Sequence, residues 1–333
     1  MNLEVLKATA QEMVSDYRGL LAADESTGTI KKRFDTINVD STEDKRRDYR
    51  EMLFRAEGLG KYISGTILYD ETLRQSAKDG TRLADLLKSQ NIIPGIKVDT
   101  GAKPLAGSAG ETVTEGLDGL TERVAEYVGL GARFAKWRAV INIADDKPTD
   151  YAIGVNAHGL ARYARICQEG GLVPIVEPEV LMDGSHDIDA CQAATERTLN
   201  AVFEALFQQG VALEGMILKP NMVISGSDCS SQADADTIAR MTVETLRRCV
   251  PAAVPGIMFL SGGQTEVEAT LNLNAMNQKY GPNPWALSYS YGRALQAGAL
   301  KAWVGKDENE SAAQEVLLTR SRANSAACAG KAA

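Results

Sequence analysis

Residues 215–220 have the sequence Gly215-Met216-Ile217-Leu218-Lys219-Pro220, and this stretch is the starting point for the fold. It is short and apolar, as a buried strand is, and it ends in a lysine followed by proline. A lysine at the buried end of a strand is costly to keep charged, so burial favours the neutral amine that attacks a carbonyl. Taken alone, the segment favours a lysine that reaches into solvent. Whether Lys219 is instead a buried catalytic amine depends on the residues at the ends of the other strands.

Seven further segments share this design of a short apolar run that ends in polar or charged residues. The eight expected strands span residues 19–24, 63–70, 92–99, 132–141, 173–180, 215–220, 256–263 and 286–291. Apolar residues at helical spacing lie between most of them. One such stripe is Leu199, Val202, Phe203 and Leu206, followed by Gly210. A second stripe is Leu117, Leu120, Val124 and Val128, followed by Gly129 and Gly131.

Strands that alternate with helices predict a parallel sheet. Eight such units in 333 residues predict a single closed (β/α)8 barrel, the TIM barrel. An open doubly wound sheet is the alternative. No Gly-x-Gly-x-x-Gly follows the first strand, which argues against the dinucleotide-binding form of that fold.

No linker rich in Pro, Gly or Ser divides the chain. We therefore expect residues 1–310 to form the barrel and residues 311–333 to form the end of a C-terminal helix and a flexible tail. The highly charged segment 35–51 predicts a solvated helix or loop before the second strand.

Composition excludes several classes of function. The net charge of -8 argues against nucleic acid as a partner, and no apolar run is long enough to span a membrane. Residues 1–11 contain no signal-peptide core, and the five cysteines form no C-x-x-C pair, so we expect a reduced, cytoplasmic chain. Two histidines are too few for an ordinary catalytic zinc site, and we expect neither a metal nor another cofactor.

Charged residues two positions apart occur at several of the strand ends. These pairs are Lys97 and Asp99, Lys136 and Arg138, and Glu177 and Glu179, to which Asp24 and Lys219 add one charge each. Residues two apart on a strand point the same way, so in a barrel these side chains converge on the C-terminal mouth, where barrel enzymes have their active sites. Each pair could instead be an ion-paired rim. Five strands with such ends favour a site, because buried ions usually lower stability.

Two loops predict a phosphate site. Ser261-Gly262-Gly263-Gln264 follows the seventh strand, and Ser290-Tyr291-Gly292-Arg293 ends the eighth. Paired glycines expose backbone N–H groups, and helix N-termini favour anions. A Ser-Gly-Gly sequence is often only a tight turn. Its position after the seventh strand favours phosphate, which many barrels bind between their last two loops.

With these residues in place, the chain resembles the class I fructose-1,6-bisphosphate aldolases over nearly its whole length. The matching motifs, in the order of the family, are Leu21-Ala22-Ala23-Asp24-Glu25-Ser26-Thr27-Gly28, Lys97-Val98-Asp99, Lys136-Trp137-Arg138, Val176-Glu177-Pro178-Glu179, Leu218-Lys219-Pro220-Asn221, Leu260-Ser261-Gly262-Gly263-Gln264 and Ser290-Tyr291-Gly292-Arg293. Each motif is moderately specific, and the ordered set is highly specific.

The resemblance implies a role for each catalytic residue. Lys219 forms a Schiff base with the ketone carbon of the substrate, and Glu177 is the general acid/base that removes water from the carbinolamine. Asp24 takes the proton of the C4 hydroxyl as the carbon–carbon bond breaks. Glu179 orients the lysines.

The resemblance also implies the residues around these groups. Lys136 and Arg138 set the electrostatics beside Glu177. The C1 phosphate is held by Ser261, Gly262, Gly292 and Arg293, with Gly263 and Ser290 in the same loops. The C6 phosphate is met by Lys97, Ser26, Thr29 and Arg33. The implied activity is a reversible, glycolytic and gluconeogenic cleavage of fructose 1,6-bisphosphate by a cytoplasmic homotetramer.

The residues support this chemistry independently. Cleavage leaves a carbanion, which a protonated imine of lysine accepts, and the neighbouring carboxylates supply proton transfers. We expect Lys136 to favour the neutral amine of Lys219 by like-charge repulsion. Two alternatives stay open: another Schiff-base lyase such as a transaldolase, and a non-catalytic scaffold on the same fold.

The C-terminal tail departs from the family. The better-known members end in a tyrosine that exchanges the proton at C3, whereas no tyrosine follows Tyr291 in this chain. Proton exchange therefore has to use another route, or the tail has no catalytic part.

Overall fold

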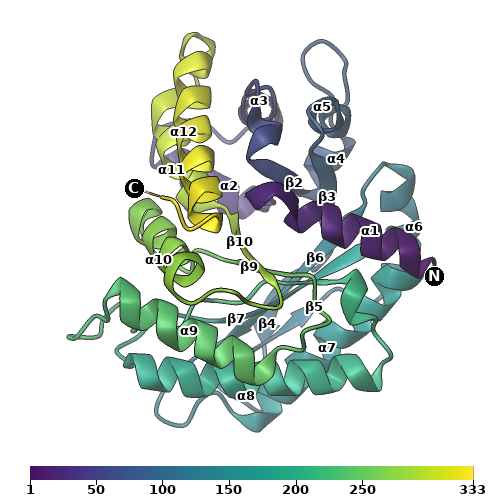
Figure 1. The fold of residues 1–333 in the computed structure, drawn as a ribbon. Coiled ribbons are helices and arrows are strands. Elements are labelled where there is room, and N and C mark those ends of the chain that lie inside the picture. Colours follow the sequence, from purple (N-terminus) through teal and green to yellow (C-terminus); the bar gives the residue numbers. More distant parts are fainter. Residues whose placement is uncertain (333) are drawn as a thin grey trace.

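Eight short apolar segments form a closed barrel of parallel strands, as the sequence predicts (Figure 1). The structure is a computed structural model and describes residues 1–332. Around the barrel the strands follow the order β1-β10-β9-β8-β7-β6-β3-β2. Their bounds are Gly19–Ala23 (β1), Ile63–Leu68 (β2), Ile93–Lys97 (β3), Phe134–Ile141 (β6), Val173–Val180 (β7), Ile217–Leu218 (β8), Gly256–Phe259 (β9) and Ala286–Tyr291 (β10).

Strand β8, which carries the starting segment, is shorter than residues 215–220. A 3-10 turn over Leu213–Gly215 precedes it. Pro220 cannot donate a backbone hydrogen bond to a neighbouring strand, because proline has no N–H. The backbone N–H of Lys219 still donates to the carbonyl of Val176 on β7 at 2.8 Å, so Lys219 keeps its place in the barrel wall.

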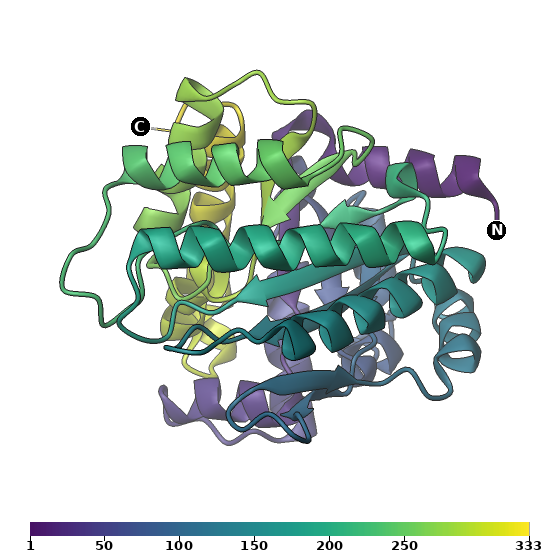
Figure 2. The ribbon, with the colours of Figure 1, turned by 90° about the horizontal axis from the view of Figure 1, so that it is seen from below.

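Helices surround the barrel and mostly begin at side-chain caps. Their bounds are Leu3–Val14 (α1), Thr27–Asp35 (α2), Glu43–Phe54 (α3), Asp70–Arg74 (α4), Leu83–Ser89 (α5), Leu120–Gly129 (α6), Asp150–Glu169 (α7), Ile188–Gln208 (α8), Ala235–Cys249 (α9), Glu266–Lys279 (α10), Arg293–Trp303 (α11) and Glu310–Cys328 (α12). Helices α7, α8 and α9 run side by side along the barrel (Figure 2). An antiparallel hairpin of β4 (Gly101–Pro104) and β5 (Thr112–Glu115), which the sequence did not reveal, follows β3.

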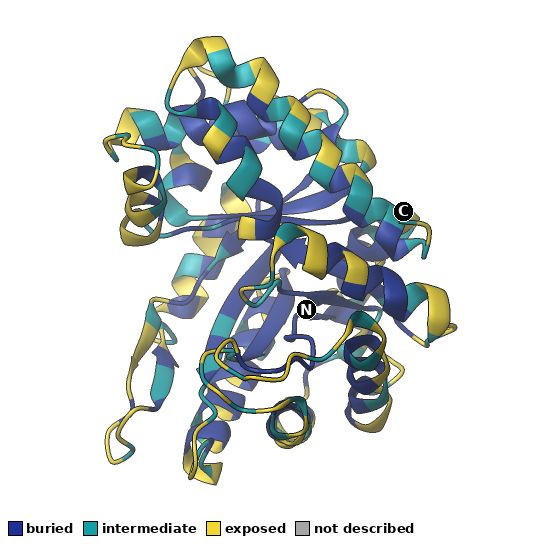
Figure 3. Cartoon of the chain, turned by 90° about the vertical axis from the view of Figure 1, so that its left-hand side faces the viewer, coloured by how far each residue is buried: buried dark blue, intermediate teal, exposed yellow. Residues whose placement is uncertain are grey.

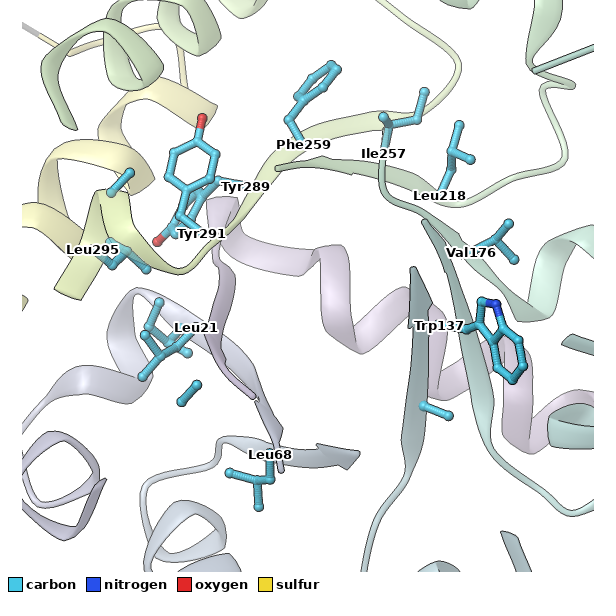
Figure 4. Close-up of a cluster of buried hydrophobic side chains, with 14 of the residues drawn as sticks. Leu21, Leu68, Trp137, Val176, Leu218, Ile257, Phe259, Tyr289, Tyr291 and Leu295 are labelled. Atoms are coloured by element: carbon cyan, nitrogen blue, oxygen red, sulfur yellow. The ribbon is translucent and has the colours of Figure 1, made fainter. Parts of the chain in front are cut away.

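The strands separate two apolar cores. Outward-facing side chains such as Trp137, Val176 and Leu218 pack under the helices, and Figure 4 shows them on neighbouring strands. Inward-facing side chains such as Phe134 and Ile217 form a second core, which α1 closes at the N-terminal end of the barrel. The barrel strands are mostly buried, and the exposed residues lie on helices, loops and the β4–β5 hairpin (Figure 3).

The alternation of side chains along β6 places charge above this inner core. Phe134 belongs to the inner core, whereas Ala135 and Trp137 belong to the outer core. Lys136 therefore points into the barrel, one layer above Phe134. The same alternation places Glu177 above Ile175 and Lys219 above Ile217. The barrel is apolar at its lower end and charged at its C-terminal mouth.

The expectation for segment 35–51 is wrong in part. Residues 43–51 belong to α3, and its charged side chains Arg46, Asp48, Arg50 and Glu51 are buried rather than solvated. The two arginines bind a carboxylate and a carbonyl of other segments, among them Glu71, and the two carboxylates accept from arginines close by in the sequence. Charge in a sequence does not reveal a partner that lies far along the chain.

The second helical stripe is also shifted. Helix α6 begins at Leu120, so Leu117 precedes it, and Val128 is 40% exposed. Tyr127 is buried in its place.

The C-terminal helix extends farther than the composition indicated. Helix α12 reaches Cys328, and Ala327 and Cys328 are buried against the protein. The backbone N–H of Ala332 donates to the side chain of Asn274 at 2.9 Å. Less of the chain is therefore left for a tail, and Ala333 lies outside the described residues. No helix within residues 1–332 is long and apolar enough to cross a membrane.

We predict that the end of α12 contributes to stability. Deleting residues 326–333 removes Ala327 and Cys328 from the core, and we expect unfolding free energy to fall by about 1–2 kcal/mol, as for other core losses of this size. Deleting residues 330–333 alone is the control: it removes the hydrogen bond of Ala332 to Asn274 but no buried side chain of the described residues, so it should lower the melting temperature less. Equal melting temperatures for both truncations would contradict this account of α12.

Candidate active site

Four charged side chains from four strands meet at the C-terminal mouth of the barrel. The Nζ of Lys219 lies 3.1 Å from Oε1 of Glu177, and the Nζ of Lys136 lies 2.9 Å from Oε2 of the same carboxylate. On its other side Lys136 donates to Oδ2 of Asp24 at 3.0 Å. The result is a row of alternating charge, Asp24, Lys136, Glu177 and Lys219, that crosses the barrel from β1 to β8.

Burial makes these ion pairs strong. The side chains of Lys136, Glu177 and Lys219 are at most 5% exposed. Burial opposes the ionised form of Lys136, but Asp24 and Glu177 outweigh it and raise the pKa of this lysine. Burial likewise opposes ionisation of Asp24 and Glu177, but Lys136 and Lys219 lower the pKa of both carboxyl groups. The resting site therefore holds ionised Asp24 and Glu177 carboxylates, each against the Lys136 ammonium.

The repulsion that we expected between the two lysines is countered by the carboxylate between them. Glu177 contacts both ammonium groups, so Lys136 does not face Lys219 directly. A neutral amine at Lys219 then requires transfer of its proton, and Glu177 is the base in contact with it. The contact with Glu177 is also the reason why a lysine with so little access to water can be retained there.

Arg138 and Glu179 lie beside this row and bind each other. The Nε of Arg138 donates to Oε2 of Glu179. Among the described residues Glu179 has no ion pair with a lysine, so its expected role of orienting the lysines is not seen as a direct contact. Asp99 is buried below the rim and accepts from the backbone N–H of Arg138 at 3.2 Å. Its other oxygen lies 3.0 Å from Nζ of Lys97.

The two expected phosphate loops differ in how open their helix N-termini are. Gly262 and Gly263 both adopt positive φ, at 54° and 83°, which explains the glycines after β9. The following helix α10 is closed by a capping box of Thr265 and Glu268, which uses N–H groups that an anion would need. The α11 helix begins after Gly292 with no side-chain cap, so its first N–H groups remain free.

The residues expected near the C6 phosphate do not all lie together. Ser26 caps α2, and its hydroxyl lies 3.1 Å from that of Thr29. Lys97 is held at the rim by Asp99. Arg33, however, approaches Gly292, because a Cβ built on that glycine would lie 3.7 Å from an Arg33 guanidinium nitrogen. The structure thus brings Arg33 to the loop that we expected to hold the C1 phosphate.

On the same side of the barrel, Ser290 lies on β10 and is buried. Its hydroxyl has no hydrogen-bond partner among the described residues. Arg293 is exposed at the first position of α11. The Arg33 guanidinium therefore lies near the open N-terminus of α11, whose first residue is Arg293.

A buried ionic network behind the mouth was missed from the sequence. Arg50 on α3 is 1% exposed and donates to the carbonyl of Glu25 at 2.7 Å. Its guanidinium also lies 3.6 Å from Glu71, which Arg46 binds with two nitrogens. Glu25 itself accepts from Arg33. The only signal in the sequence was the position of Glu25 directly after Asp24, because the partner residues are distant along the chain.

Residues 1–332 contain no group of three or more histidine, cysteine, aspartate or glutamate side chains arranged to hold a metal ion. The site consists of amines, guanidinium groups and carboxylates. Such a set can form a covalent imine, move protons and bind anions.

Comparisons with known proteins agree with this geometry. A family model described as class I fructose-bisphosphate aldolase matches residues 5–333. Fructose-bisphosphate aldolase 1 of Toxoplasma gondii is 58% identical over 328 residues, which cover 98% of this chain and 90% of that protein. The cytosolic fructose-bisphosphate aldolase 4 of Arabidopsis thaliana is 56% identical over 325 residues, which cover 98% of this chain and 83% of that protein.

A solved structure shares the whole fold. The fructose-bisphosphate aldolase from Plasmodium falciparum, crystallised in complex with TRAP and a small-molecule inhibitor, superposes with a TM-score of 0.98. It is 54% identical, and the match covers 99% of this chain and 95% of that one.

We predict that Lys136 raises the free energy of unfolding at neutral pH and does so less at acidic pH. Lowered pKa values of Asp24 and Glu177 in the folded protein add stability that is present above the unfolded pKa values near 4 and is lost as pH falls through the folded ones. Lys136→Met removes the ammonium that lowers these two pKa values. Breaking such a buried ion pair should lower the unfolding free energy at neutral pH by about 3–5 kcal/mol. The difference from wild type should shrink as pH falls.

Lys31→Met is the matched control, because Lys31 bonds Asp35 at 2.8 Å on the exposed surface of α2. Urea unfolding at several pH values measures both variants. A loss for Lys136→Met that does not depend on pH would refute the electrostatic explanation.

Proposed function

The chain belongs to the class I fructose-bisphosphate aldolase family, and we propose that it cleaves fructose 1,6-bisphosphate reversibly through a Schiff base on Lys219. The products are dihydroxyacetone phosphate and glyceraldehyde 3-phosphate. The observation that carries the proposal is the contact of buried Lys219 with Glu177 at the mouth of the barrel. Class I aldolases are the metal-independent lyases of this reaction, and the iminium formed from the lysine amine acts as the electron sink.

In imine formation Lys219 is the nucleophile, and Glu177 first accepts and then returns a proton. Glu177 accepts the proton of the Lys219 ammonium, and the free amine adds to the C2 carbonyl. Glu177 then returns a proton to the carbinolamine hydroxyl, which leaves as water and gives the iminium. The 3.1 Å separation of the two side chains is within the range for direct proton transfer.

Bond cleavage needs a base on the opposite side of the substrate. Asp24 accepts the proton of the C4 hydroxyl, the C3–C4 bond breaks, and its electrons pass to the iminium, which becomes an enamine. Lys136 donates to Asp24 and contacts Glu177, so one cation supports both carboxylates. Protonation of the enamine at C3 and hydrolysis of the iminium then release dihydroxyacetone phosphate and restore Lys219.

Phosphate groups at both ends of the sugar would fix its position. For the C1 phosphate we propose the N-terminus of α11 with Gly292 and Arg293, together with Ser261 and Gly262 of the loop after β9. For the C6 phosphate we propose Lys97 and the Ser26–Thr29 turn. The open helix N-terminus at Gly292 supports the first assignment.

Four finer features are inferred from the family: location, pathway, oligomeric state and the part of the tail. We infer a cytoplasmic location, since the Arabidopsis relative is named as cytosolic. We infer service in both glycolysis and gluconeogenesis because the reaction is reversible. The homotetramer stays a prediction of the resemblance, and sedimentation equilibrium would test it. The tail, which lacks the family's tyrosine, is inferred to have no part in proton exchange.

We predict that borohydride traps dihydroxyacetone phosphate on Lys219. Reduction of the imine gives a stable secondary amine, which peptide mass spectrometry locates. Lys219→Arg is the control and should give no adduct while the protein stays folded. EDTA should leave cleavage unchanged. An adduct on Lys136 or a loss of activity with EDTA would overturn the assignment.

We predict that Glu177→Gln lowers turnover by about 10²–10⁴-fold, the range typical of a lost general acid/base. The amide keeps the shape of the side chain but cannot take the proton of Lys219. Binding of the phosphate groups should hold, because Glu177 does not lie in the proposed phosphate loops. Steady-state cleavage and binding of dihydroxyacetone phosphate measure the two effects. An unchanged turnover number would assign the proton transfers to another group, such as Glu179.

A further inference from the structure

Gln296 on α11 is buried at the back of the mouth and connects three segments. It is 1% exposed, and its amide nitrogen donates to the carbonyl of Ala22 on β1 at 2.6 Å and to Oε1 of Glu25 at 3.0 Å. Its amide oxygen accepts from the hydroxyl of Tyr49 on α3 at 3.0 Å. All of its hydrogen-bonding groups are therefore used on neighbours that surround the end of β1.

Glu25 links Gln296 to Arg33. The same oxygen, Oε1, that accepts from Gln296 also accepts from a guanidinium nitrogen of Arg33. The Arg33 side chain is only 22% exposed, and its other nitrogens make no hydrogen bond among the described residues. One of these nitrogens is the group that approaches Gly292. The fork of Arg33 is thus fixed on one side and free on the side of the α11 N-terminus.

Arg50, on the other side of Glu25, helps to hold the Glu25 side chain in place. Arg50 donates to the Glu25 backbone and lies 3.7 Å from Oε2 of its carboxylate. Glu25 is therefore held between two arginines, of which only Arg33 can reach an anion at the mouth. A long side chain that is fixed before binding loses less conformational entropy when it binds.

We propose that Gln296 is a positioning residue that acts through Glu25 to aim Arg33 at the phosphate bound by the α11 N-terminus. This inference rests on the proposed function, and it assigns Arg33 to the C1 phosphate rather than to the C6 phosphate. Gln296 itself does not touch the substrate. It sets the direction of a guanidinium whose free nitrogens complete the anion site of Gly292 and Arg293.

Gln168 provides a matched control. It is 0% exposed, lies on α7, and its amide also donates to two acceptors, the carbonyls of Ala212 and Gly215, at 2.8 and 3.1 Å. These acceptors precede β8, at the end of the barrel opposite to the mouth. Gln296→Met and Gln168→Met therefore remove similar buried hydrogen bonds, and only the first lies behind the phosphate site.

The test is steady-state kinetics of Gln296→Met, Arg33→Met, their double variant and Gln168→Met. We expect Gln296→Met to raise KM for fructose 1,6-bisphosphate about tenfold, the equivalent of one charge-assisted hydrogen bond, with kcat within about threefold. The double variant should have the KM of Arg33→Met, because Gln296 acts only through Arg33. Gln168→Met should leave KM unchanged. KM for fructose 1-phosphate should rise as much, since it carries the C1 phosphate.

Several outcomes would overturn the proposal. Additive effects of Gln296→Met and Arg33→Met, or an equal rise of KM in Gln168→Met, would show a general structural role. A rise for the bisphosphate alone would place Arg33 at the C6 phosphate. If Gln296→Met does not fold, Glu25→Gln replaces it with the same expectations. A wild-type protein that does not cleave fructose 1,6-bisphosphate refutes the proposed function, whereas active wild type with unchanged KM in Gln296→Met refutes this inference alone.

Discussion

The contact of Lys136 with both Asp24 and Glu177 is the interaction on which the mouth of this barrel depends. The three residues come from β6, β7 and the end of β1, and β1 and β6 are not neighbours in the barrel. A single ammonium therefore spans the interior and pairs with both carboxylates, of which only Glu177 has a second ion-pair partner within residues 1–332, Lys219. Without it, Asp24 would require a proton or a wider opening to water, and Glu177 would keep Lys219 as its one ion-pair partner among the described residues.

This arrangement is possible because the inner side chains form layers. Phe134, Ile175 and Ile217 form the apolar layer near α1, and the next inward residues on the same strands are Lys136, Glu177 and Lys219. The alternation of a strand gives both layers from one sequence pattern. It explains why the barrel and the convergence of four charged side chains at its mouth could be predicted from short motifs: each motif lies at the end of one strand, and the parallel register brings the strand ends together.

The parts that could not be predicted depend on contacts between distant segments. Segment 35–51 has the composition of an exposed helix, yet Arg50 and Arg46 are buried because Glu25, after β1, and Glu71, on α4, neutralise them. Gln296 gives no signal at all in the sequence, since an isolated glutamine in a helix is ordinarily exposed. For the same reason the sequence did not show that Arg33, which we expected near the C6 phosphate, approaches Gly292. Its direction is set by Glu25, and the sequence shows only that α2 follows β1.

The charge of the site explains how a buried cation can serve catalysis. In the resting protein the ammonium of Lys219 faces the carboxylate of Glu177, and in the proposed intermediate an iminium occupies the same place with the same charge. The surroundings that stabilise the first therefore stabilise the second without rearrangement, which is the condition for electrostatic preorganisation. Between the ammonium and the iminium states Lys219 is briefly a neutral amine, and during that time Glu177 carries the proton. Glu177 then holds the proton that the departing hydroxyl needs, so the ion pair that keeps Lys219 stable in the folded protein also supplies the acid for the next step.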